Sequence, residues 1–138
     1  MSSLANVSRE KGSGRQHLYS VYRRIKENCC DEWRTNSKNF YAWYENRVNK
    51  QKGLCEYCDL PGNTEAYYQR TFRKGRRGLN LEVDRKDNSQ QYSPENCVLA
   101  CYPCNNAKSD VFSYEEFLKI GEAIRKVKQS ANIARRSK

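Results

Sequence analysis

Apolar residues are scarce in this sequence of 138 residues, of which 37% are hydrophobic and whose mean hydropathy is −1.06. No apolar run approaches the roughly 18 residues that a membrane-spanning helix needs, so we expect no membrane protein. Residues 1–14 also lack the apolar stretch of a secretory signal, and we therefore expect a cytoplasmic protein whose thiols stay reduced. A chain of this length predicts one domain, and its small apolar supply predicts that a further source of stability is needed.

Acidic residues and histidine are also in short supply. The 16 Asp and Glu are outnumbered by 26 Lys and Arg, which gives a formal net charge of +10, and His17 is the one histidine. A positive field of this size attracts polyanions and indicates a nucleic-acid partner. Basic and aromatic residues are interleaved most densely in the loop 66–80, where rings can stack on bases. We therefore predict that DNA is contacted by the polar and basic side chains of this loop, namely Gln69, Arg70, Arg73, Lys74, Arg76 and Arg77.

Cysteine, by contrast, is abundant, with seven in the chain. Four of them form two C-x-x-C pairs, Cys55 with Cys58 and Cys101 with Cys104. Two such turns supply the four thiolates that tetrahedral zinc prefers. We predict a structural zinc site here, whose binding free energy of ~10–16 kcal/mol would offset the weakness of the core. Cys97 lies in an apolar run and is expected to be a small buried side chain.

Hydrophobic periodicity and turn signals predict mainly helices around one small pair of strands. We expect helices over 15–27, from Ser37 to just before Gly53, over 104–109, and from a capping box at Ser113–Glu116 onward, with strands over 79–84 and 96–101 and a break over 28–36. The last helix is expected to carry its apolar face on Phe117, Ile120, Ile124 and Val127.

The order strand, loop, strand, helix is a ββα unit, and two potential metal ligands lie at its junctions. Asp84 ends the first strand, and Asn105 directly follows Cys104 at the start of the helix. A carboxylate and an amide oxygen are ligands that suit Mg²⁺ or Mn²⁺.

Three segments of this unit together resemble the HNH family of ββα-metal nucleases. They are Val83-Asp84-Arg85, Tyr92-Ser93-Pro94-Glu95-Asn96 and Cys101-Tyr102-Pro103-Cys104-Asn105-Asn106-Ala107-Lys108. The resemblance covers residues 53–112 and is greatest to a rare-cutting restriction enzyme of that family. It implies an α+β fold, a small ββα-metal core stapled by the four-cysteine zinc site with flanking α-helices. The implied divisions are a flexible arm over 1–14, a helical segment packing on the core over 15–52, the nuclease core over 53–112, and a C-terminal helix with a basic tail over 113–138.

Carried over by position, the resemblance also implies residue roles. Asp84 and Asn105 would hold the catalytic Mg²⁺ or Mn²⁺, Asn96 would pin the loop between the strands, and Lys108 would contact DNA. Arg85 stands where the family has its general-base histidine; because arginine cannot accept a proton, we expect Arg85 to grip the scissile phosphate. Tyr92 is then the expected group that initiates cleavage, with His17 as the alternative.

The function that the resemblance implies is a site-specific, divalent-metal-dependent endonuclease that hydrolyses phosphodiester bonds in double-stranded DNA. A bacterial or phage-encoded restriction endonuclease is the preferred interpretation. A phage or intron homing endonuclease or nickase of the same fold, a non-catalytic zinc-ribbon DNA-binding protein and an RNA-directed nuclease are the alternatives. One active site cuts one strand, so a double-strand break predicts a homodimer.

Overall fold

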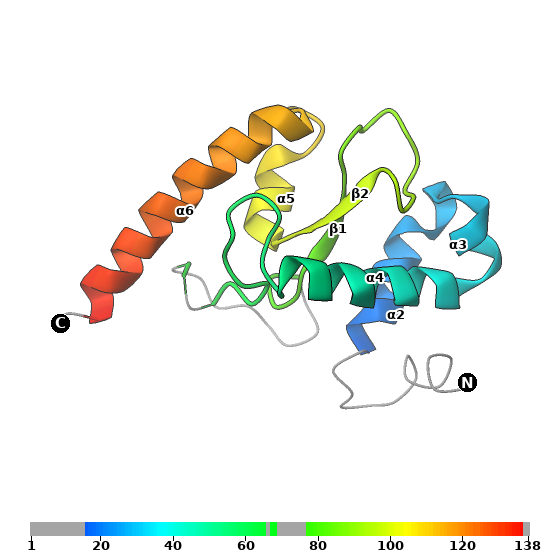
Figure 1. The fold of residues 1–138 in the computed structure, drawn as a ribbon, viewed down its shortest axis with the longest axis horizontal. Helices are drawn as coiled ribbons and strands as arrows, with labels where there is room; N and C mark the ends of the chain where they lie inside the picture. The colour runs from blue at the N-terminus through cyan, green and yellow to red at the C-terminus, as the bar shows by residue number, and fades with distance from the viewer. Residues whose placement is uncertain (1–15, 66, 69–76, 137–138) are drawn as a thin grey trace.

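A computed structural model describes residues 16–65, 67–68 and 77–136 (Figure 1). The elements in chain order are α2 (Gln16–Ile25), the 3-10 turn η1 (Lys26–Asn28), α3 (Asp31–Thr35), α4 (Ser37–Gln51), β1 (Glu82–Arg85), β2 (Cys97–Ala100), α5 (Tyr102–Lys108) and α6 (Tyr114–Arg136). The predicted α+β class is confirmed. The predicted arm over 1–14 lies outside the described residues, and so do the loop residues Gln69, Arg70, Arg73, Lys74 and Arg76.

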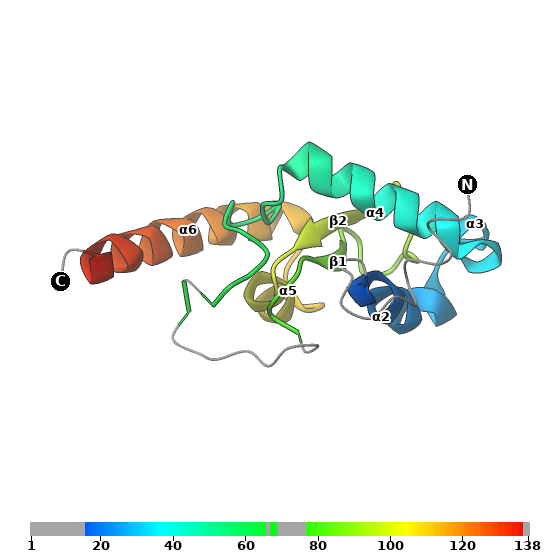
Figure 2. The ribbon, with the colours of Figure 1, turned by 90° about the horizontal axis from the view of Figure 1, so that it is seen from below.

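The two strands form the centre of the molecule. They pair antiparallel, with Val83 opposite Leu99 and Asp84 opposite Val98. All four residues of β2 are buried, because the sheet is covered on both faces. In Figures 1 and 2, α2 and α3 lie at one end of this sheet, α4 runs alongside it, and α6 extends beyond the other end. None of the described helices combines the length and the apolar character that crossing a membrane would need.

The N-terminal helices contribute an aromatic part of the core. Trp33 and Phe40 are completely buried with their ring centroids 5.1 Å apart, and the hydroxyl of Tyr22 donates to the Trp33 carbonyl at 2.8 Å. Trp33 belongs to α3, which lies inside the segment 28–36 where the sequence predicted a break. A helix of five residues is too short to display hydrophobic periodicity, so only the packing of Trp33 reveals it.

Side chains of α4 join these helices to the sheet. Gln51 donates from Nε2 to the carbonyl of Leu99 at 2.9 Å and accepts from the Leu99 amide through Oε1 at 3.1 Å. Its amide therefore pairs with the backbone of β2 as a neighbouring strand would. The Tyr44 hydroxyl donates to the Leu81 carbonyl at 2.6 Å, just before β1 begins. The position of β1 and β2 is thus fixed from α4 by hydrogen bonds to backbone groups.

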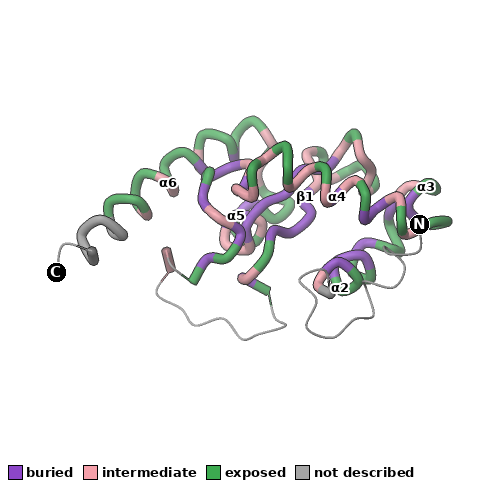
Figure 3. Tube along the Cα trace, turned by 60° about the horizontal axis from the view of Figure 1, so that its bottom comes forward, coloured by how far each residue is buried: buried purple, intermediate pink, exposed green. Residues whose placement is uncertain are grey.

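The last helix begins as the sequence predicts and then leaves the core. The capping box is confirmed: the Ser113 amide donates to the Glu116 carboxylate at 2.9 Å, and the Glu116 amide donates to the Ser113 hydroxyl at 3.1 Å. Phe117 is fully buried, whereas Val127, which was predicted to share its apolar face, is 64% exposed. The prediction for Val127 was wrong because α6 extends past the elements it packs on (Figure 3).

Gly121 is the point where α6 touches the turn between Cys55 and Cys58. A Cβ atom added at Gly121 would lie 2.3 Å from the Tyr57 carbonyl oxygen, which is closer than van der Waals contact permits. The absence of a side chain at this position therefore lets the helix backbone rest directly on the backbone of the turn.

Replacing Gly121 with alanine tests this contact. We expect Gly121→Ala to destabilise the protein by about 1–3 kcal/mol, because a backbone carbonyl cannot give way as a side chain can. Thermal and denaturant unfolding measure the change, with the exposed Ser130→Ala on the same helix as the control. A rise in stability, the result that helix propensity alone would produce, would contradict the close contact.

Candidate active site and four-cysteine cluster

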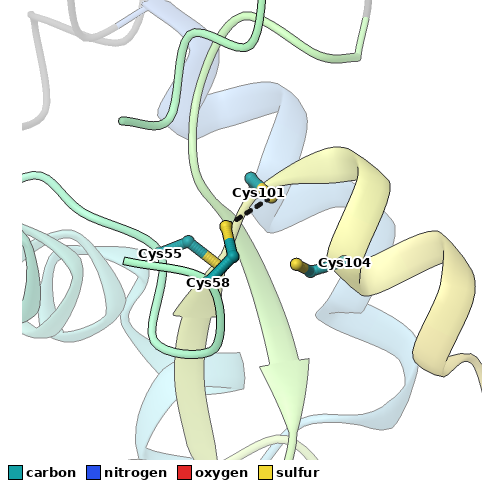
Figure 4. A group of neighbouring side chains, drawn as sticks. All are labelled: Cys55, Cys58, Cys101 and Cys104. Atoms are coloured by element: carbon teal, nitrogen blue, oxygen red, sulfur yellow. Dashed lines mark hydrogen bonds between the residues drawn. The ribbon is translucent and has the colours of Figure 1, made fainter. Parts of the chain in front are cut away.

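Four buried cysteines form a compact cluster (Figure 4). The sulfur atoms of Cys55, Cys58, Cys101 and Cys104 all lie within 4.8 Å of one another. The Cys58 and Cys101 sulfurs are 3.7 Å apart, far beyond the length of a disulfide bond. Hydrogen bonds from Cys101, then from Cys104 and Cys58, hold the pKa of the Cys55 thiol below its ordinary value. Four closely placed thiolates are the donor set of a structural zinc site, as the sequence predicts.

The first cysteine pair lies on a tight turn that is attached to the sheet. The Cys55 amide donates to the Leu60 carbonyl at 2.8 Å, and the Tyr57 amide donates to the Cys55 sulfur at 3.4 Å. The amide of Glu56 donates to the Leu99 carbonyl at 2.9 Å. The second pair lies where β2 passes into α5, with Cys101 at the helix N-cap. The cluster therefore joins the turn after α4 to the point where β2 passes into α5.

Asp84 lies on β1 in a buried position with a cation beside it. Its carboxylate is 4% exposed, and Oδ2 accepts the Tyr57 hydroxyl and forms an ion pair with the Lys108 ammonium at 3.4 Å. Burial raises the pKa of the Asp84 carboxyl, while the Tyr57 and Lys108 contacts act in the opposite direction. The buried charge is thus compensated by one hydroxyl and one ammonium group.

Asn105 lies opposite β1 on α5 and contacts a second buried carboxylate. Its Nδ2 donates to Glu82 Oε1 at 2.9 Å. Arg77 completes the group with a two-pronged contact to Glu82, at 2.8 Å from Nε and 2.7 Å from the terminal nitrogen, and its guanidinium lies 4.5 Å from the centre of the Tyr102 ring. Because Glu82 and Asp84 are two residues apart in a strand, both side chains point to the face that α5 covers.

The structure therefore brings Asp84 and Asn105 to two elements that face each other, with separate partners for each side chain. Glu82 and Tyr57 are site residues that the sequence analysis did not identify. Glu82 could have been predicted from strand alternation, because a residue two positions before Asp84 lies on the same face of the strand. For Tyr57 the sequence offered only its place inside a cysteine pair.

Arg85 and Tyr92 lie together at the other end of β1. The Arg85 guanidinium is 4.7 Å from the centre of the Tyr92 ring, and it donates to the Gln90 carbonyl at 3.1 Å. Burial raises the pKa of the Tyr92 phenol above its ordinary value of 10.0, although Arg85 lowers it in part. Asn96 holds the same loop, because its Nδ2 donates to the carbonyls of Asp87 at 3.0 Å and Gln91 at 3.1 Å.

Two other candidate residues have surroundings that the sequence did not reveal. Lys108 was expected to contact DNA, but its side chain is fully buried and its ammonium donates to the Arg85 carbonyl at 2.9 Å. The structure therefore gives Lys108 an internal partner in place of a phosphate. His17 lies in α2, where its ring centroid is 5.5 Å from that of Tyr44. It lines a pocket with residues of α4 and of the segment before β1, and among the described residues none of the other predicted site residues lines that pocket.

No protein-family model matches this chain, and no curated protein matches it. Among solved structures, the chain is similar to the rare-cutting HNH restriction endonuclease PacI, whose structure was described for a mechanism of DNA perturbation. The two chains are 29% identical, and the match covers 80% of this chain and 78% of PacI with a TM-score of 0.58. The strand pair, the helix after it and the cysteine cluster match the HNH fold of PacI, which confirms the resemblance seen in the sequence.

Removing zinc tests the role of the cysteine cluster. We expect a strong chelator, or the substitution Cys58→Ser, to abolish cooperative unfolding and reduce helical circular dichroism, because zinc binding contributes ~10–16 kcal/mol in comparable sites. Elemental analysis should find one zinc ion per chain. Cys30→Ser, at a partly exposed cysteine outside the cluster, is the control and should keep its zinc. A metal-free chain with unchanged stability would contradict a structural zinc site.

Proposed function

We propose that this chain, which has the HNH fold of PacI, is a nuclease that uses a divalent metal to hydrolyse phosphodiester bonds at specific sites in double-stranded DNA. A restriction endonuclease is the form we propose. The observation that carries the proposal is the junction of β1 and α5, where the buried carboxylate of Asp84 and the amide of Asn105 lie on facing elements. The four-cysteine cluster supports it by fixing that junction.

A hard divalent cation fits the residues at this junction. Asp84 already contacts a positive charge, the Lys108 ammonium, and it does so through Oδ2. Asn105 uses its Nδ2 for Glu82, which leaves its amide oxygen as the atom with which it would hold the cation. Oxygen donors of this kind suit Mg²⁺ or Mn²⁺. When bound, the ion would neutralise charge on the scissile phosphate and on the leaving oxygen.

Arg85 and Tyr92 are the groups we propose for the reacting phosphate. Arg85 is half-buried and follows Asp84 in β1, and a guanidinium binds phosphate oxygens through paired hydrogen bonds. Tyr92 lies against Arg85, and its phenolate would accept the proton of the attacking water in place of the family's general-base histidine. At pH 7 an ordinary phenol is about 0.1% ionised, which costs roughly 4 kcal/mol, so the positive charge of Arg85 is needed at this position.

The DNA contacts we propose come from the basic loop and from α6. The loop residues Arg70, Arg73, Lys74, Arg76 and Gln69 keep the role predicted from the sequence. Helix α6 adds exposed and half-exposed basic side chains along its free half, among them Arg125, Lys126 and Lys128. Backbone contacts of this kind would position the duplex, and two copies of the chain would be needed to cut both strands.

A non-catalytic DNA-binding protein is the second candidate function. The observation that favours it is Arg85, which stands where the family has its general-base histidine and cannot accept a proton. Such a protein would bind DNA and would leave the duplex intact with Mg²⁺ present.

Incubating plasmid DNA with the zinc-loaded protein separates the two functions. We expect cutting that requires Mg²⁺ or Mn²⁺, with sequencing of the cut ends revealing one recurrent site. Asp84→Asn and Asn105→Ala should each lower the cleavage rate at least about 100-fold, because the metal supplies several kcal/mol of charge stabilisation. Asn106→Ala, at the exposed neighbouring position, is the matched control. Binding without cleavage by the unmodified chain would favour the regulator.

Tyr92→Phe tests the proposed initiating group. We expect single-turnover cleavage to be lost while DNA affinity stays within about twofold, since the ring and its contact with Arg85 remain. In the unmodified chain the cleavage rate should rise about tenfold per pH unit through pH 9 without a plateau, because the pKa of Tyr92 is raised above 10.0 and the ionised fraction grows with pH. A Phe variant that cuts at the normal rate would remove Tyr92 from the mechanism.

A further inference from the structure

One residue connects the cysteine cluster directly to the candidate active site. Tyr57 belongs to the turn between Cys55 and Cys58, and its hydroxyl donates to Oδ2 of Asp84, 27 positions further along the chain. Both residues are buried, with 4% of each exposed. A displacement of this turn would therefore change the position of the carboxylate.

Tyr57 is held from several sides. Its ring packs at 5.2 Å from that of Phe117 and 5.8 Å from that of Tyr114, both on or at the start of α6. Gly121 rests on its backbone, and its amide donates to the Cys55 sulfur. The hydroxyl consequently has little freedom to seek another acceptor.

The neighbouring residue of the turn is held as firmly. Glu56 accepts from Arg47 of α4 at 3.1 Å and from the Tyr114 hydroxyl at 2.6 Å. The turn is thus fixed between α4 and α6 by side chains, in addition to the two cysteines. Helices α4 and α6 thus meet at the turn whose Tyr57 hydroxyl donates to Asp84.

The partner of Tyr57 differs from those of the buried tyrosines Tyr22 and Tyr44. The hydroxyls of Tyr22 and Tyr44 donate to backbone carbonyls, which is enough to satisfy a buried phenol. Tyr57 donates to a carboxylate at the junction of β1 and α5. Carboxylates that bind metals are commonly oriented by such hydrogen bonds, and loss of the partner weakens metal binding by about 10–100-fold.

We propose that Tyr57 is a positioning residue for the catalytic metal: it holds Oδ2 of Asp84 from within the cysteine turn, so that the other carboxylate oxygen, Oδ1, faces the ion. The inference rests on the proposed function. It makes the four-cysteine cluster part of the geometry of catalysis as well as a source of stability. Because the hydroxyl is a neutral donor, it orients the carboxylate without adding to the positive charge that Lys108 already places at Oδ2.

Two phenylalanine substitutions test this role in the full zinc-loaded chain. Tyr57→Phe removes the hydroxyl at Asp84 and keeps the ring that packs on α6. Tyr114→Phe is the matched control, because it removes a hydroxyl from the same turn at Glu56. Calorimetric titration with Mn²⁺ measures the metal affinity, elemental analysis measures the zinc content, and single-turnover assays measure cleavage.

We expect Tyr57→Phe to keep its zinc and to bind Mn²⁺ about 10–100-fold more weakly, with a matching rise in the Mn²⁺ concentration needed for cleavage. Tyr114→Phe should stay within about twofold of the unmodified chain in both measurements. Equal Mn²⁺ affinity in Tyr57→Phe and the unmodified chain would overturn the inference, and so would equal losses in both variants, which would indicate general loosening of the turn.

A further control separates this inference from the proposed function. Asp84→Asn should abolish the Mn²⁺ binding event that the unmodified chain displays. An unmodified chain that binds Mn²⁺ through Asp84 but never cuts DNA would overturn the nuclease and keep the role of Tyr57 in metal binding. An unmodified chain without this binding event would overturn both.

Discussion

The cluster of four sulfurs is the constraint on which the rest of this structure depends. Its two halves lie far apart in the sequence, one just after α4 and the other where β2 enters α5. A domain of this size is typically stable by about 5–15 kcal/mol, and a zinc site of this type contributes a comparable amount. Only 37% of the residues are hydrophobic, and the four cysteines lie in the same buried cluster as Trp33 and Phe117, so a zinc ion would add its stability to a small apolar core.

The parts of the fold that the sequence predicted are those with a local cause. Each cysteine pair and the capping box at Ser113 depend on residues a few positions apart, and each of the two strands has its own local pattern. Helix α3 was not predicted because a helix of five residues is too short to show hydrophobic periodicity. Val127 was misassigned since periodicity identifies one face of a helix and does not reveal where the partner surface ends. Lys108 was expected to contact DNA, but it is buried. Its position in the motif did not reveal that it pairs with the carboxylate of Asp84 inside the protein.

The candidate site was predictable in its members and less so in their partners. The motif indicated Asp84 and Asn105 because ligands at fixed offsets from a cysteine pair form a specific pattern. The groups that orient them, Tyr57 and Glu82, come from a turn and a strand position that carry no motif of their own. Such contacts arise only when separate elements pack, so composition and motif spacing cannot predict them.

Electrostatics connects these observations. In a chain of net charge +10, Glu82 and Asp84 form an acidic pair on one face of a strand, and each has its own cation, Arg77 and Lys108. Removing either cation would leave a buried carboxylate without its partner, which costs about 3–5 kcal/mol. Glu82 and Asp84 are therefore stable in these positions only with positive charge nearby. A divalent ion adds more of the charge that these carboxylates already favour, and a phosphate brings the negative charge that Arg85 and the ion together can hold. Under the proposed function, the catalytic ion would be held beside these buried acids, and the DNA phosphate would be bound by that ion and by Arg85.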